Sequence, residues 1–133
     1  MKKISLFAVM VLLVMITSCK KEIGTSETEM TFETEKHDFG TITQGDKVDY
    51  DFKFKNTGGS DLIITGAKGS CGCTVPEYPK EAIKPGVSGV IKVSFNSAGK
   101  SGKQAKSVTL FCNINEGKKV LHINSNIEVP EKD

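Results

Sequence analysis

The cysteines are the residues of this chain whose type and spacing best suit chemistry. Cys71 and Cys73 are separated by one glycine in the segment "KGSCGCTVPEYP", residues 68–79, and the chain's other cysteines are Cys19 and Cys112. Two thiols at this spacing can bind a soft metal ion, exchange a disulfide, contribute to a structural bridge or simply lie in a turn. Which chemistry is open to them depends on the compartment, and therefore on the N-terminus.

The N-terminal segment "MKKISLFAVMVLLVMITSC" has a basic start, a short apolar run and small residues ahead of a cleavage point. These are the three parts of an export signal. The apolar run, residues 4–16, is shorter than the roughly 20 residues that span a bilayer core. Ser18 directly before Cys19 resembles a lipobox, which implies cleavage before Cys19 and diacylglycerol on its thiol. We expect residues 1–18 to be a lipoprotein signal peptide, with the membrane as a partner through the lipid on Cys19.

The remaining chain is long enough for one domain and too short for two. Residues 19–30 comprise the lipidated cysteine and a polar stretch without periodicity, which predicts a flexible tether. A single domain is expected at 31–129, followed by a tail at 130–133. Acidic residues directly after a lipidated cysteine can direct related lipoproteins to the cell surface, but here the sequence is "KKE". We therefore expect a lipid-anchored protein of the bacterial cell envelope that faces the periplasm, in the inner leaflet of the outer membrane.

Hydrophobic residues recur with a period of two from Thr31 onward. In "KVDYDFKFKN", residues 47–56, Val48 and every second residue up to Phe54 are apolar and alternate with charged residues. This alternation predicts a half-buried strand. Further runs of this kind occur at 62–67, 87–95, 106–114 and 118–129, whereas residues 96–107 are rich in Gly, Ser and Lys and are predicted to be a mobile loop. No segment has helical periodicity, so the pattern predicts an all-β sandwich.

Two segments resemble a known family. "HDFGTITQGDKVDYDFKFKNTG" and "LIITGAKGSCGCTVPEYPKEAIKPGVSGVIKVSFNSAGKSG" closely resemble the envelope lipoproteins grouped as domain of unknown function 1573. The resemblance covers about residues 34–127, and "SCGCT" and the turn "I-x-PG-x-SG" are its most specific pieces. It implies an immunoglobulin-like sandwich of about seven strands, related in shape to modules of ciliary and centrosomal Hydin-type proteins. It implies no established activity.

The composition argues against several classes of function. The formal net charge is +2, and all 18 basic residues are lysine, so we expect no nucleic-acid partner. The chain has no tryptophan and lacks the motifs of hydrolases, phosphate-binding loops and calcium loops. We therefore expect a protein that is not an enzyme and needs no cofactor. Its predicted role is a membrane-anchored binding or scaffolding module with a protein partner.

Several pairings of the thiols are open at this point. Cys112 is in phase with Leu110 and should point into the core, where a free cysteine packs as a small hydrophobe. A bridge from Cys112 to Cys71 or Cys73 would add roughly 3 to 4 kcal/mol of stability and requires Cα atoms within about 7 Å. A direct Cys71–Cys73 bond would instead close a small, strained ring that is easily reduced.

The same thiols support an alternative function. Cys71, Cys73 and Cys112 together would suit copper(I) or zinc, and His37 is an additional candidate ligand, although a turn role is favoured for it. The alternative prediction is therefore thiol-dependent binding of copper or zinc, or redox exchange, at the Cys71–Gly72–Cys73 motif.

Lipidation can be tested by metabolic labelling with a clickable fatty acid. We expect the label on the wild-type protein and its loss in Cys19→Ala, because the acyl group has no other thiol at the cleavage point. Equal labelling of both proteins would show that Cys19 is not the lipidated residue.

Overall fold

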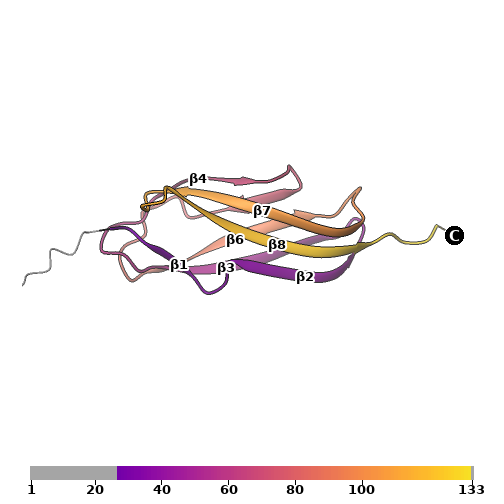
Figure 1. Cartoon of the computed structure of the whole chain (residues 1–133), viewed down its shortest axis with the longest axis horizontal. Coiled ribbons are helices and arrows are strands. Elements are labelled where there is room, and N and C mark those ends of the chain that lie inside the picture. Colours follow the sequence, from indigo (N-terminus) through magenta and orange to yellow (C-terminus); the bar gives the residue numbers. More distant parts are fainter. Residues whose placement is uncertain (1–26, 133) are drawn as a thin grey trace, which may run out of the picture.

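Eight β-strands form two sheets of four strands each that pack face to face (Figure 1). The computed structural model describes residues 27–132. Its strands are β1 (Met30–Phe32), β2 (Lys36–Thr43), β3 (Lys47–Asn56), β4 (Ile64–Gly69), β5 (Thr74–Glu77), β6 (Ser88–Asn96), β7 (Gly102–Cys112) and β8 (Lys118–Glu128). The strand order is β1-β3-β6-β5 in the first sheet and β2-β8-β7-β4 in the second. The predicted all-β sandwich is confirmed, with eight strands in place of about seven.

The additional strand, β5, lies within residues 68–79, a segment where the sequence pattern indicated no strand. β5 pairs antiparallel with β6, placing Thr74 opposite Phe95 and Pro76 opposite Val93. It is short and lies at the edge of its sheet, a position where proline is tolerated. The Gly and Pro residues around β5 are typical of turns, so the sequence pattern did not predict this strand.

The centre of the first sheet is the antiparallel pair of β3 and β6. Phe52 lies opposite Ile91 and Tyr50 opposite Val93. Phe52, Ile91 and Val93 have no exposed surface, while the lysines and aspartates between the apolar residues of β3 face solvent. The alternation in the sequence therefore correctly identified the face of β3 that enters the core. Burial of each large apolar side chain contributes about 1.5 to 3 kcal/mol.

The second sheet contributes the facing half of the core through β7 and β8. These strands pair antiparallel over their whole length, with Val108 opposite Leu121. Residues 97–101 alone separate β6 from β7, so the prediction of a mobile loop at 96–107 was wrong for residues 102–107. This part of β7 is paired with β8 from Gly102 onward. Residues 102–107 are polar or small and are exposed or half-buried, although Ile123 and Ile127 opposite this part of β7 are buried.

The chain changes sheets between its first two strands. β1 pairs with the end of β3, and the chain then crosses to the second sheet, where β2 runs parallel to β8. All other strand pairs are antiparallel. Within residues 27–132 no helix has the length and apolar character needed to cross a bilayer. The predicted signal peptide and Cys19 lie outside the described residues.

One buried polar side chain ties two loops together at one end of the sandwich, the β3–β4 loop and the β5–β6 loop. Asn56 has no exposed surface. Its Nδ2 donates hydrogen bonds to the carbonyl oxygens of Ser60 and Ile83, both at 2.8 Å, and its Oδ1 accepts one from the Gly58 N–H at 3.0 Å. Loss of this side chain would remove all three hydrogen bonds, although the Ile83 carbonyl would still accept from the Leu62 N–H. Removing a partner from a polar group that is shielded from water is costly.

The variant Asn56→Ala should lower the free energy of unfolding by about 2 to 4 kcal/mol, because one buried and two part-buried hydrogen bonds disappear together. Urea denaturation followed by circular dichroism measures the change. Asn124→Ala removes an exposed amide on β8 and serves as the control, with an expected change within about 0.5 kcal/mol. Equal stability of the two variants would contradict the structural role of Asn56.

Candidate functional site

The corner between β4 and β5 carries the segment "SCGCT". β4 ends at Gly69 in the second sheet and β5 begins at Thr74 in the first, so residues 70–73 cross from one sheet to the other (Figure 1). Both cysteines of the motif lie in this crossing, outside the strand alternation that decides which side chains enter the core.

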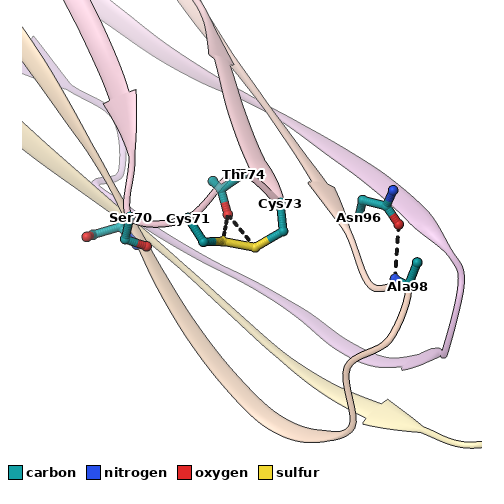
Figure 2. Close-up of a disulfide and its surroundings, with 7 residues drawn as sticks. Ser70, Cys71, Cys73, Thr74, Asn96 and Ala98 are labelled. Carbon is teal, nitrogen blue, oxygen red and sulfur yellow. Dashed lines mark hydrogen bonds between the residues drawn. A yellow bond between two sulfur atoms is a disulfide. The ribbon is translucent and has the colours of Figure 1, made fainter.

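Cys71 and Cys73 are joined to each other by a disulfide bond across Gly72, with their Cα atoms 5.2 Å apart (Figure 2). Cys112 is a free, buried thiol. Among the pairings that the sequence left open, the structure therefore forms the direct one, and a bridge to Cys112 is absent.

Strand register explains why Cys112 is not the partner. β4 and β7 are antiparallel, and Cys112 lies opposite Ile64 at the start of β4. The crossing follows Gly69 at the other end of β4, opposite Val108. Cys112 does point into the core, as its phase predicted, and is 6% exposed. Burial raises the pKa of its thiol, while a backbone hydrogen bond at Ile114 and the charge of Lys119 oppose that shift.

Backbone hydrogen bonds hold the crossing to strands of both sheets. On the side of β7, the Ser70 N–H donates to the Ser107 carbonyl at 2.8 Å, and the Ser107 N–H donates to Ser70 Oγ at 3.1 Å. On the side of β6, the Asn96 N–H donates to the Cys73 carbonyl at 2.9 Å. The disulfide is therefore carried by a fixed segment.

Thr74 is the polar side chain nearest to the disulfide. Its Oγ1 lies 3.6 Å from Cys71 Sγ and 3.8 Å from Cys73 Sγ, and the residue is only 2% exposed. Figure 2 shows the hydroxyl directed at the sulfur pair. Thr74 carries no distinguishing signal in the sequence. Its position next to Cys73 was visible, but a threonine at the start of a strand is ordinary.

A shallow groove of about 350 Å³ opens beside Cys73. Gly72, Cys73 and Asn96 line it, together with the charged residues Lys47 and Asp49. Cys71 is not among the lining residues. The groove therefore borders the disulfide at Cys73, and Thr74 lies against both sulfurs.

The two glycines of the segment have different roles. A Cβ atom on Gly69 would overlap the carbonyl oxygen of Thr74, whereas a Cβ on Gly72 would have no neighbour within 4 Å. Gly69 is therefore required for the close approach of β4 and β5. Gly72 lies in open space and leaves one side of the disulfide uncovered.

His37 belongs to a different part of the molecule. It lies in β2, at the edge of the second sheet opposite to β4, and stacks on Tyr50 with ring centroids 3.6 Å apart. Its ring also meets Phe39 edge-on at 4.7 Å. Burial lowers the pKa of His37, and the charge of Asp38 partly opposes that shift. His37 therefore packs against neighbouring rings and is not placed to join the cysteines as a ligand.

The metal site suggested as an alternative does not assemble from the described residues. Its third thiol, Cys112, lies at the far end of β4, and Cys71 and Cys73 are bonded to each other. Within residues 27–132, no group of three or more His, Cys, Asp or Glu side chains is placed to hold a metal ion.

The family model described as "Protein of unknown function (DUF1573)" matches residues 30–127. The chain belongs to this family. The match includes all eight strands apart from the last residue of β8, and it includes the disulfide. No curated protein matches the sequence.

Solved structures with the same architecture come from proteins of different kinds. A protein of unknown function from Porphyromonas gingivalis W83 is similar with a TM-score of 0.67 and 14% identity, covering 82% of this chain and 51% of that one. The ASH/PapD-like domain 7 of human CEP192 is similar with a TM-score of 0.60 and 11% identity, covering 80% and 89%. The secreted serine protease VesC from Vibrio cholerae is similar with a TM-score of 0.55 and 11% identity, covering 77% and 23%.

These likenesses establish the fold, because the sequence identities are too low to carry function. The chain spans about half of the Porphyromonas gingivalis protein and less than a quarter of VesC. It matches nearly the whole of the PapD-like domain, in agreement with the immunoglobulin-like sandwich that the family resemblance implied.

The variant Gly69→Ala should lower the free energy of unfolding by about 2 to 3 kcal/mol, because β4 and β5 must separate to admit the methyl group. Gly72→Ala is the matched control in the same turn and should change it by less than about 1 kcal/mol. Thermal and urea denaturation of both variants provide the measurement. Equal destabilisation would show that the crossing is not held as closely as the structure indicates.

Proposed function

We propose that the protein is a lipid-anchored lipoprotein of the bacterial cell envelope whose sandwich serves as a non-catalytic binding or scaffolding module. The export signal and the lipobox at Cys19 support the anchor. Membership of the family and the PapD-like fold name neither a compartment nor an activity. The proposed position is the periplasmic side, in the inner leaflet of the outer membrane.

The observation that carries the binding role is the edge strand β2. Each sheet ends in two edge strands, and β2, with eight residues, is the longest of the four. Its only partner strand within residues 27–132 is β8. Within β2, the backbone groups of Lys36 and Thr43 and the Gly40 N–H are already hydrogen-bonded to side chains of the same chain. The rest of its outer edge is open to backbone pairing with an extended segment of a partner protein.

The side chains of β2 define what such a partner would meet. His37, Phe39 and Ile42 are half-buried, and Phe39 and Ile42 pack against the core. Lys36, Asp38 and Thr41 are exposed. A register shift between Asp38 and Thr41 divides the edge into two short stretches. The strand therefore favours a short, extended partner segment that pairs through its backbone and meets charged and polar side chains.

The other edges are less suited to strand addition. β1 has three residues and β5 has four, with Pro76 in the middle of β5. Short strands and proline are common ways in which proteins protect sheet edges. The segment before β4 already forms a bridge between Leu62 and Ile83 on its open side.

A photo-reactive amino acid placed at Thr41 in β2 should crosslink to an envelope protein in intact cells and give an adduct of one defined mass. The same group at Ala105, exposed on the central strand β7, is the control and should give no such adduct. Peptide mapping should place the crosslink in an extended segment of the partner. Absence of an adduct at Thr41, or the same adduct at Ala105, would contradict binding at this edge.

A further inference from the structure

We propose that the Cys71–Cys73 disulfide is a thiol–disulfide exchange site that oxidises a substrate carrying two thiols. The inference rests on the geometry of the crossing between β4 and β5. It requires neither the lipid anchor nor partner binding at β2, and it adds a chemical activity to the proposed module.

The first requirement for exchange is access to sulfur. Structural disulfides are commonly shielded in the core, whereas exposed ones are the labile and reactive ones. Cys71 and Cys73 are only half-buried, and Gly72 between them is exposed. No atom lies within 4 Å of where a Gly72 side chain would begin. The two cysteines are only two positions apart in sequence, so the bond links no distant strands. Its reduction would leave the strand pairing and the core packing in place.

The second requirement is a direction of approach. A thiolate attacks one sulfur along the S–S axis while the other sulfur departs on the opposite side. The groove of about 350 Å³ is lined by Cys73 and not by Cys71. In Figure 2, Asn96 lies on the Cys73 side of the disulfide, away from Cys71, and Asn96 also lines the groove. Cys73 also packs against the core, so the groove is the side from which it is approached. We therefore assign Cys73 Sγ as the attacked atom and Cys71 Sγ as the leaving group.

The third requirement is stabilisation of the leaving thiolate. Thr74 Oγ1 lies 3.6 Å from Cys71 Sγ, slightly closer than to Cys73 Sγ at 3.8 Å. Its hydroxyl can donate a hydrogen bond to the negative charge that develops on Cys71, and hydrogen bonds to ionised acceptors are the stronger ones. Because Thr74 is buried and sits at the start of a strand paired with β6, the donor is fixed in place. Thr74 acts here as a positioning residue for the leaving sulfur.

The exchange then proceeds in two balanced steps. A substrate thiolate attacks Cys73 Sγ, forms a mixed disulfide and breaks the Cys71–Cys73 bond, and the electron pair goes to Cys71 Sγ. The second thiolate of the substrate attacks the substrate sulfur of the mixed disulfide, and the electron pair goes to Cys73 Sγ. The two cysteine thiolates take up the two protons that the substrate thiols release. The substrate is oxidised to a disulfide by two electrons, and the protein becomes a dithiol.

Cys112 has no part in this sequence. It lies opposite Ile64, at the end of β4 remote from the crossing, and it is buried in the core. Burial raises the pKa of its thiol, which keeps it protonated and unreactive.

The first test compares rates of reduction of the purified full-length protein by excess dithiothreitol at neutral pH. Aliquots are quenched with acid and alkylated, and mass spectrometry counts the free thiols of the peptide that contains both cysteines. We expect complete reduction while circular dichroism shows that the fold persists. Thr74→Val keeps the shape of the side chain and should slow reduction about fivefold to tenfold, since it removes a hydrogen bond to a developing charge.

Thr109→Val is the matched control, because Thr109 lies on β7 without contact to the sulfurs, and its rate should equal that of the wild type. A peptide with two cysteines replaces dithiothreitol in a parallel series. Whichever of the two reductants reacts faster per thiolate, the peptide or dithiothreitol, identifies a protein or a small-molecule dithiol as the substrate. A disulfide that stays oxidised in the folded protein, or equal rates for Thr74→Val and Thr109→Val, would overturn the proposal.

The second test remains informative if Thr74→Val does not fold. Cys71→Ser leaves Cys73 as a single thiol at the corner, and Cys73→Ser leaves Cys71. Each protein reacts with excess oxidised glutathione, and peptide mapping follows the mixed disulfide at the remaining cysteine. We expect the adduct to form severalfold faster at Cys73, beside the groove. Equal rates, or a faster adduct at Cys71, would overturn the assignment of the attacked sulfur.

Discussion

The burial of alternate side chains between the two sheets is the constraint from which the rest of the structure follows. Phe52, Ile91 and Leu110 have no exposed surface and fill the space between β3, β6 and β7. Because strand residues alternate between two faces, this packing fixes the orientation of every other side chain in those strands. Cys112 follows the alternation into the core and is unavailable as a partner. Cys71 and Cys73 lie where the chain leaves one sheet for the other, so the alternation leaves them at the surface.

The crossing at the cysteines depends on a close approach that side chains would prevent. Gly69 lies against the carbonyl of Thr74 without room for a Cβ atom, and backbone hydrogen bonds from Ser70 and Asn96 fasten the two flanks. The turn between them is then short enough for Cys71 to reach Cys73. The groove beside Cys73 and the hydroxyl of Thr74 give the two sulfurs different surroundings. This difference underlies their assignment as attacked and leaving atoms.

Much of the fold could be predicted from the sequence because, in β3, β6, β7 and β8, the alternating apolar residues are the residues that are buried. The strict pattern around Phe52 and the inward phase of Cys112 are both seen in the structure. Residues 102–107 of β7 were predicted to be a loop because their side chains show no apolar alternation. Backbone pairing with β8 keeps them in the sheet. The parallel placement of β2 beside β8 depends on contacts between distant segments and is not encoded in local spacing. The Cys71–Cys73 bond is local, but the sequence left a bridge to Cys112 open because the strand register that separates Cys112 from the crossing was not known. The role of Thr74 became visible only with the distances to both sulfurs.

The pairing of the cysteines in the native protein tests the account most directly. Protein isolated from its native cells under acid, alkylated before reduction and cleaved after lysine gives one peptide between Lys68 and Lys80 that contains both Cys71 and Cys73. The account predicts that mass spectrometry finds this peptide unalkylated and two hydrogens lighter than the dithiol form, with Cys112 as a free thiol. A bridge from Cys112 to either cysteine, or separate alkylation of Cys71 and Cys73 in the isolated protein, would contradict it.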